Sequence, residues 1–311
     1  MSIEELKELQ LKIIKKNKIC NTIGAIILIL ALAAIVFVGT INKINIQTLL
    51  ICCFFAFVFC FIVFMVIKGI VNGKDIDAFN KAYKNLFVLK SLETKFDNLI
   101  FKPEQGFSKS YVDKIGMIDT ADRFTSNDYI SGTYKGIKFE QSDMHIEEEH
   151  ESTDSDGNTT TTWITIFRGR LMVFDFNKTF KANILVSSKY FSADRLPWGK
   201  RFSKIKMEDI EFNKNFIVYS QSEHEAFYVL TPHFMEKIKT LTNKLNCGIM
   251  FAFVDNKLHI AINNNEDSFE ANVFKIINEE EIKESITSDI DLITNFVEEL
   301  KLDKDLFRKE V

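Results

Sequence analysis

The chain of 311 residues has room for a membrane segment and one or two soluble domains, and 46% of its residues are hydrophobic. Its formal net charge of −4 argues against a general nucleic-acid binder, which would carry a basic patch or stripe. Three prolines and 12 glycines beside 30 phenylalanines exclude a disordered chain, so the sequence can build a packed core.

Two apolar stretches follow each other near the N-terminus, at residues 23–41 and 49–67, and neither contains a charged residue. Each spans about 19 residues, which at about 1.5 Å per residue approaches the ~30 Å hydrocarbon thickness of a bilayer. A buried helix of a soluble protein and, for the first stretch, a cleaved signal peptide are the alternatives. Two such stretches almost back to back instead predict a transmembrane hairpin. It divides the chain into an anchoring segment at residues 1–71 and a soluble domain at residues 72–311.

Lysines on both sides of the hairpin predict its orientation. The flanking lysines are Lys7, Lys12, Lys15, Lys16, Lys18, Lys68, Lys74, Lys81, Lys84 and Lys90. The turn between the stretches carries only Lys43. Because positively charged flanks stay in the cytoplasm, we expect a multi-pass protein of the inner (plasma) membrane with both termini and the soluble domain cytoplasmic. Neither stretch holds an ionisable residue in its interior, so the hairpin is expected to be a tether in the lipid bilayer and not an ion pathway.

Three amphipathic helices are predicted in the soluble part. The first begins at Asp75, whose side chain can cap it, and its apolar positions continue to Leu99. The second is opened by Thr231, a good N-cap residue, followed by a proline that is tolerated at the first helical position. The third is capped by Asn278 and covers residues near 279–301.

Runs rich in aromatic and β-branched residues are predicted as strands. They cover residues 134–140, 163–176, 182–187, 216–220, 226–230, 249–254 and 257–262. Helices and strands are segregated along the chain, because no βαβ alternation appears. The predicted fold class is therefore α+β, with an N-terminal transmembrane hairpin followed by a cytoplasmic domain of antiparallel β-hairpins packed with helices.

An acidic stretch separates the first two predicted strands. Four glutamates lie within residues 147–151, and the stretch ends in an Asp-Gly pair at residues 156–157 that is typical of a hairpin turn. The simplest structure is a long β-hairpin with a solvated, acidic tip near residues 143–160. That tip and the C-terminal helix are the two candidate surfaces for a protein partner.

The acidic tip also raises the question of a metal site. His145, His150, Glu147, Asp154 and Asp156 could together ligate zinc or a harder cation. The spacing of the two histidines is not that of ligands on one helix, and the loop lacks the distal glutamate of a calcium loop. We therefore favour a solvated loop, and no metal or other cofactor is predicted.

Motifs for catalysis do not occur in the sequence. There is no Gly-x-Ser-x-Gly elbow and no glycine-rich phosphate loop. Cys247 follows a predicted helix, and the C-terminal end of a helix dipole does not activate a thiolate. No catalytic or cofactor-binding residue is predicted. Catalytic groups can still converge in space, so the question of an enzyme stays open, with a binding role preferred.

Several segments of the soluble part resemble one bacterial family. The most specific is Glu-Ala-Phe-Tyr-Val-Leu-Thr-Pro at residues 225–232, which follows a similar run at residues 208–220. Residues 167–178 and 253–262 look like strands of the same family. The family is the domain of unknown function 3137. The resemblance implies a bacterial two-span membrane protein with no assigned activity, and it supplies no catalytic residues.

The sequence thus predicts a membrane-tethered binding or scaffold module. The first alternative is a membrane-bound enzyme that acts on a lipid or envelope component. The second is an accessory subunit of a transport assembly, whose spans would pack on other helices. Small residues of the first span offer such a face, and they are Gly24, Ala25, Ala31, Ala33 and Ala34.

Overall fold

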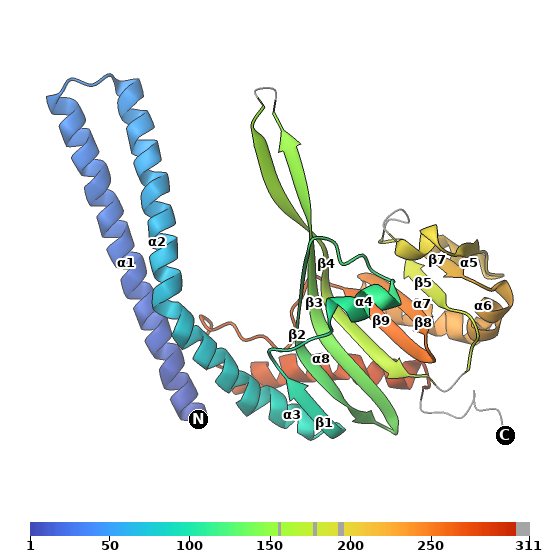
Figure 1. Ribbon diagram of the computed structural model, residues 1–311. Coiled ribbons are helices and arrows are strands. Elements are labelled where there is room, and N and C mark those ends of the chain that lie inside the picture. The colour runs from blue at the N-terminus through green and yellow to red at the C-terminus, as the bar shows by residue number, and fades with distance from the viewer. Residues whose placement is uncertain (155–156, 177–178, 192–195, 303–311) are drawn as a thin grey trace. The chain divides into compact units, whose positions relative to one another are not determined.

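A computed structural model describes residues 1–154, 157–176, 179–191 and 196–302. The chain forms two compact units, each made of two segments that are distant in sequence. The first unit joins Met1–Val88 to Glu270–Ile282, and the second joins Leu89–Phe269 to Lys283–Val311. Figure 1 shows the order of the elements from the N-terminus in blue to the last helix in red.

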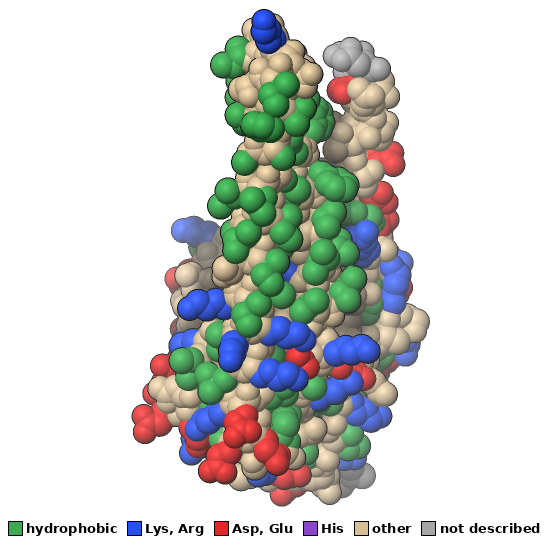
Figure 2. Space-filling model, turned by 90° about the vertical axis from the view of Figure 1, so that its left-hand side faces the viewer, with side chains coloured by type: hydrophobic (Ala, Val, Ile, Leu, Met, Phe, Trp, Pro, Cys, Tyr) green, Lys and Arg blue, Asp and Glu red, His purple; other side chains and the backbone are tan. Residues whose placement is uncertain are grey.

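Two long helices, α1 (Ile3–Ile41) and α2 (Ile46–Tyr83), form most of the first unit. Both are long and apolar enough to cross a membrane, and only 6% and 0% of their most hydrophobic windows are buried. Figure 2 shows hydrophobic side chains over the upper part of these helices and Lys and Arg side chains gathered below. A Cβ atom added at Gly24 would lie 2.4 Å from the ring of Phe64, so this glycine lets the two helices approach closely.

Below the apolar stretch, polar side chains join α1 to α2. The Lys16 ammonium group donates to Asp75 Oδ2 at 2.9 Å and to the Val71 carbonyl at 2.6 Å. The same lysine lowers the pKa of Asp75, with a smaller contribution from Lys12. Asp75 therefore lies inside α2 as an ion-pair partner. The prediction that a separate helix begins there is wrong, because nothing interrupts the helical backbone after the apolar stretch.

The later segment of the first unit is held against α1 by one buried amide. Gln10 is 1% exposed, and its Nε2 donates to the carbonyl groups of Val273 and Lys275. The backbone N–H of Ile277 donates to Gln10 Oε1 at 3.0 Å. These three hydrogen bonds pair the polar atoms of an amide that would otherwise be costly to bury. They hold α1 and a segment about 265 positions later in the sequence together.

The second unit is built on a nine-stranded sheet in the order β1-β2-β3-β4-β9-β8-β5-β7-β6, and every neighbouring pair is antiparallel. The strands are β1 (Asp97–Lys102), β2 (Arg123–Tyr134), β3 (Ile137–Thr153), β4 (Thr159–Asp175), β5 (Ile184–Ser188), β6 (Ser203–Ile205), β7 (Phe216–Ser220), β8 (Gly248–Val254) and β9 (Lys257–Asn263). The predicted α+β class with antiparallel strands is confirmed.

Short helices complete the second unit and cover both faces of the sheet. They are η1 (Lys84–Leu89, a π-helical segment that begins in the first unit), α3 (Lys90–Glu93), α4 (Lys109–Ile115), η3 (Pro197–Lys200), α5 (Ile210–Asn215), α6 (Glu223–Val229), α7 (Pro232–Leu245) and α8 (Glu279–Glu299). Figure 1 shows α4 and α8 on opposite faces of the sheet. The predicted helix after Thr231 is confirmed as α7, with the Thr231 hydroxyl accepting from the Phe234 N–H.

The two faces of the sheet differ in what they bury. On one face, side chains of α4 and the indole of Trp198 pack on Leu171, Val173 and other apolar strand residues. On the other face, the ring of Phe174 contacts Phe296 of α8 with centroids 6.4 Å apart. Alternate residues of a strand point to opposite faces of the sheet. Those that point to this second face include polar and charged side chains as well as apolar ones.

Three predicted elements are wrong. Of residues 226–230, the first four lie in helix α6 and Leu230 is its C-cap; Ser222 caps the first turn, so local capping overrides their β-propensity. The predicted helix through Leu99 ends earlier, and Leu99 lies in β1. Residues 134–140 contain a turn, because Lys135 and Gly136 have φ values of 49° and 81° that match a two-residue hairpin loop.

Candidate functional site

The β3–β4 hairpin extends beyond the rest of the sheet. Its two strands have 17 residues each and pair from Phe139 to Thr153, with a register shift between Ile146 and Glu147. In the described chain, β2 pairs with β3 only as far as Glu147, and β9 pairs with β4 only from Arg170 onward. The hairpin beyond these points, residues 147–153 with 159–165, is here called the outer ribbon. Figure 1 shows it standing clear of the sheet.

The outer ribbon presents an acidic face. Glu147, Glu149 and Glu151 alternate along β3 and therefore share one face. Trp163 lies directly opposite Glu149 on the same face, and the guanidinium carbon of Arg123 lies 3.4 Å from the centroid of its ring. Most of these side chains are exposed or half-buried, so the face is available for contact.

The residues singled out as weak metal candidates are distributed along the ribbon. His145 Nε2 lies 3.0 Å from the Thr165 hydroxyl and 4.0 Å from Glu147 Oε1. His150 Nε2 lies 3.0 Å from Glu148 Oε2. Asp154 accepts two bonds from Asn158 and closes the turn.

Asp156 lies outside the described residues. A metal site at the tip stays untested, and its described candidates are engaged in local hydrogen bonds.

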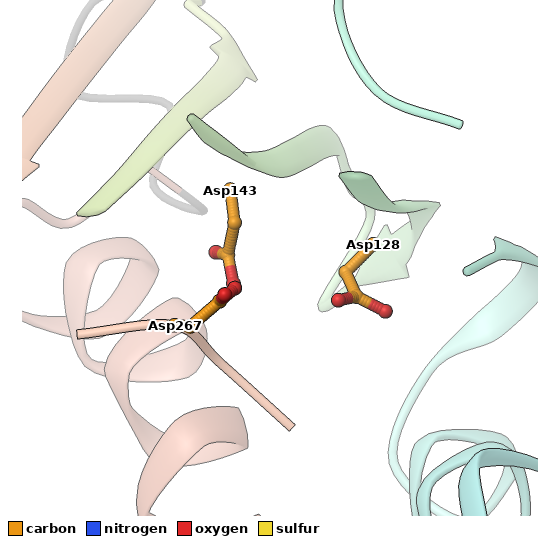
Figure 3. A group of neighbouring side chains, drawn as sticks. All are labelled: Asp128, Asp143 and Asp267. Carbon is orange, nitrogen blue, oxygen red and sulfur yellow. The ribbon is translucent and has the colours of Figure 1, made fainter. Parts of the chain in front are cut away.

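A different group of carboxylates comes together on the second face of the sheet. Ligand oxygens of Asp128, Asp143 and Asp267 all lie within 4.8 Å of one another. Figure 3 shows the carboxyl groups of Asp143 and Asp267 meeting, with Asp128 beside them. Asp128 and Asp143 are 0% and 3% exposed, whereas Asp267 reaches the surface. This set is called the acidic cluster below.

Local backbone geometry brings the acidic cluster together. The register between β2 and β3 shifts between Asn127 and Ile130, and Asp128 lies in this β-bulge with a φ of 54°. Asp143 lies in the middle of β3, opposite Asn127. Asp267 follows β9, and the next residue, Ser268, binds Asp143 through both its backbone N–H and its hydroxyl, the latter at 2.7 Å.

Two arginines and a helix carboxylate surround the acidic cluster. Arg170 lies opposite Asp143 in the β3–β4 ladder, is 3% exposed, and donates to the carboxylate of Asp289 on α8. Arg168 Nη2 lies 3.9 Å from Asp267 Oδ2. Gly169 between the arginines has a φ of 152°, and an added Cβ would lie 2.0 Å from the Ile262 carbonyl. Only glycine fits at this position. The close approach of β4 to the end of β9 between the two arginines therefore depends on it.

Burial dominates the electrostatics of Asp143. It raises the pKa of this carboxyl well above its usual range, and a hydrogen bond with Asp267 raises it further. The Arg170 guanidinium and the bonds from Ser268 act in the opposite direction. A carboxylate that is both buried and close to other carboxylates is stable only with a proton or a compensating positive charge.

A cavity of about 630 Å³ lies elsewhere in the second unit, on the first face of the sheet. Its lining includes the apolar side chains of Met117, Phe191 and Met250 and charged side chains of both signs, Asp119 and Glu148 beside Lys200 and Arg201. Such a mixed lining suits a ligand with both apolar and polar groups.

Comparison with known proteins finds a family match over one part of the chain, most of which lies in the second unit. Residues 165–302 match the model of a family described as "Protein of unknown function (DUF3137)". This part of the chain is a DUF3137 domain. The resemblance found in the sequence is confirmed for these residues, which run from within β4 to the end of α8. The DUF3137 match includes Arg170, Asp267 and Asp289 of the site but neither Asp128 nor Asp143.

Among solved structures, the chain is similar to the crystal structure of the mycobacterial trehalose monomycolate transport factor A, TtfA. The match covers 72% of this chain and 94% of that chain, with 10% sequence identity and a TM-score of 0.37. A TM-score at this level does not establish a shared fold. No curated protein matches the chain.

The acidic cluster was missed by sequence reasoning because its members are 15 and 124 positions apart and no short motif joins them. A weaker signal was present. Asp143 and Arg170 are charged residues inside runs that otherwise form buried strands, and such residues are buried only when paired.

Proposed function

We propose that this protein is a membrane-anchored binding module that holds a DUF3137 domain at the cytoplasmic face of the plasma membrane. The outer ribbon is the surface that it offers to a partner protein. One observation carries this proposal: the outer half of the longest hairpin is exposed on both faces and continues beyond both neighbouring strands. An isolated two-stranded hairpin is marginal in water, so a partner is expected to complete it.

The exposure of α1 and α2 supports membrane anchoring. A core helix of a soluble protein is mostly buried, whereas the hydrophobic windows of these helices are 6% and 0% buried. Large apolar side chains such as Phe55, Phe59 and Ile70 are 66%, 68% and 75% exposed. Lipid is the environment in which such a surface is stable, because large exposed apolar patches on soluble proteins are unusual.

The flanking lysines support the cytoplasmic orientation. Lys16 and its neighbours lie below the apolar stretch of α1, and Lys68 follows that of α2, whereas Lys43 stands alone in the turn. Positive residues are retained on the cytoplasmic side during insertion.

This orientation can be tested with a single cysteine at Thr161 in a cysteine-free background. A membrane-impermeant thiol reagent should label it only after the membrane is opened, and labelling of intact cells would contradict a cytoplasmic domain.

The chemistry of the ribbon supports a basic partner that pairs along a strand edge. The row of Glu147, Glu149 and Glu151 favours lysine or arginine side chains opposite it. An exposed strand edge recruits an extended segment through backbone hydrogen bonds, with alternate side chains giving specificity. Trp163 in the centre of this face is of the residue type that anchors interfaces.

A photoreactive amino acid at Thr161, in the full chain in its native membrane, tests the ribbon directly. A discrete cross-linked partner is expected, and it should disappear when Glu147, Glu149 and Glu151 are all changed to Lys. The matched control changes the exposed Glu93, Glu104 and Glu284 to Lys and should keep the cross-link.

The same photoreactive group at the exposed Asn243 on α7 should not give that product. No product at Thr161, or one that survives reversal of the ribbon charges, would refute the assignment of the partner surface.

The cavity favours a second candidate function, a membrane-bound enzyme or carrier for an amphiphile with an anionic group. Lys200 and Arg201 line the cavity together with apolar side chains and could pair with an anionic group of a ligand, although Asp119 and Glu148 line it as well. Changing both residues to Gln should weaken retention of co-purified anionic lipid if this candidate is correct. Unchanged lipid content would rule out this second candidate function.

A further inference from the structure

We infer that the acidic cluster of Asp128, Asp143 and Asp267 binds a hard divalent cation, Ca²⁺ or Mg²⁺, inside the second unit. Three carboxylates from three separate chain segments converge so that one ion can contact an oxygen of each, since these oxygens lie within 4.8 Å of one another. Figure 3 shows the carboxyl groups of Asp143 and Asp267 meeting, with that of Asp128 to one side. In the part of the chain that the structure describes, this is the group with such geometry.

A second observation, independent of the carboxylates, points to a ligand. Gln141 is 0% exposed, and both its amide oxygen and its amide nitrogen lack a hydrogen-bond partner. Gln141 lies two positions before Asp143 on β3 and therefore on the same face. Asp128 occupies the bulge between the partners of these two residues, Ile130 and Asn127.

Gln141 thus neighbours Asp143 along β3, and its cross-strand partner Ile130 lies next to the bulge that carries Asp128. A buried amide without a partner costs about 1–3 kcal/mol, and native proteins rarely retain one without a reason. An amide oxygen is an ordinary ligand of Ca²⁺, either directly or through a bound water. A cation at the cluster would therefore explain both the convergent carboxylates and the unpaired amide.

The charge of the surroundings leads to the same conclusion. Four carboxylates meet there when Asp289 is included, and two guanidinium groups, Arg168 and Arg170, face them. Arg170 is directed to Asp289, and Ser268 binds Asp143. A divalent cation would supply positive charge at the point where the carboxylates of the acidic cluster converge.

The donor set selects the class of cation. Carboxylate and amide oxygens suit Ca²⁺ and Mg²⁺, whereas zinc and copper sites in proteins are dominated by histidine and cysteine. An ion there would tie β2, β3 and the segment after β9 together, because each supplies one carboxylate. Its predicted consequence is a more stable DUF3137 domain.

The test uses the full chain in detergent, freed of metal with EDTA and titrated with CaCl₂ or MgCl₂ by isothermal calorimetry. Saturable binding of one ion per chain is expected, together with a rise in the thermal midpoint that grows with ion concentration. Asp267→Asn should weaken binding at least about tenfold. Its side chain is 37% exposed, so this variant should fold. Gln141→Leu should weaken binding several-fold, because leucine fills the same buried space but offers no amide oxygen to the ion.

Asp291→Asn is the matched control, because Asp291 lies on α8, is 48% exposed, and loses the same charge outside the acidic cluster. It should bind the ion as the unmodified chain does. The inference is overturned if neither cation binds saturably to the unmodified chain, or if Asp267→Asn and Asp291→Asn bind equally well.

Discussion

The part of the β3–β4 hairpin that lies between β2 and β9, here called the inner half, shares one hydrogen-bonded ladder with the outer ribbon. The two parts differ in environment, because the inner half is buried and the outer ribbon is exposed. Phe139, Phe167 and Phe174 of the inner half are at most 2% exposed, whereas most of the outer ribbon is exposed. The inner half lies between β2 and β9, and the ribbon extends beyond both strands. The presence of neighbouring strands therefore separates the part of the hairpin that stabilises the fold from the part that is available for binding, and the β3–β4 register shifts at the boundary between them.

The largest effect should come from the inner half. Phe174→Ala removes a fully buried ring that contacts Phe139 and Phe296, and it should lower the free energy of unfolding by about 3–5 kcal/mol. Ile164→Ala in the ribbon should change it by less than about 0.5 kcal/mol, since Ile164 is 46% exposed.

Urea unfolding in detergent measures both changes. Fluorescence of the buried Trp198 reports on the second unit when Trp163 is replaced by Phe, because the chain has two tryptophans. Equal losses for Phe174→Ala and Ile164→Ala would break the distinction between the two halves.

The next effect concerns the charged residues of the inner half. Arg170→Met removes the guanidinium that pairs with Asp289 and faces Asp143, and it should destabilise the fold by about 3–4 kcal/mol. The double variant with Asp289→Leu should recover part of that loss, because no unpaired carboxylate then remains at α8. The same unfolding assay measures both, and a double variant no more stable than the single one would contradict a direct pair.

A smaller effect depends on pH. His259 on β9 donates from Nδ1 to the Ala252 carbonyl and accepts from the Tyr111 hydroxyl at 3.1 Å, so the neutral ring is the bound form. Burial lowers the pKa of His259 to about 4, compared with about 6.5 in the unfolded chain.

The unfolded state therefore takes up a proton before the folded state does. Stability from His259 is complete above pH 6.5 and is lost as pH falls from about 6.5 to about 4, by about 2–3 kcal/mol. His259→Asn should flatten this part of the stability–pH curve. Replacement of the exposed His224 by Asn should leave the curve unchanged, and a curve equally steep in both variants would disprove the assignment.

The smallest effect is expected from removing the ribbon itself. Replacing residues 149–163 with an Asn-Gly turn keeps the pairing of the inner half and should change stability by less than about 1 kcal/mol. A loss of stability near that of Phe174→Ala would show that the ribbon holds the fold together.

The sequence predicts the fold class because its signals are local. Apolar runs, the Thr231 cap and the Asp-Gly turn each act within a few residues, and the elements they predict are present. The misassigned elements needed information of another kind. Residues 226–230 have strand-like side chains, but Ser222 caps a helix that includes most of them. At Lys135 and Gly136, the turn requires positive φ at both positions.

The acidic cluster shows why the site was less predictable than the fold. Asp128 reaches it only because the β2 strand is bulged, and Asp267 only because the segment after β9 folds back on β3. Neither event leaves a motif in the sequence. The exposed acidic residues near 147–151, by contrast, were conspicuous, and their predicted place on a hairpin is what the structure contains.

Hydrogen–deuterium exchange of the full chain tests the central contrast most directly, when native membrane vesicles are compared with purified protein in detergent. Amides of the inner half should exchange slowly in both samples. Amides of residues 147–153 and 159–165 should exchange quickly in the purified protein and become protected in native vesicles, where the partner is present. Equal exchange of the ribbon in the two samples would contradict its proposed role as the surface that binds a partner protein.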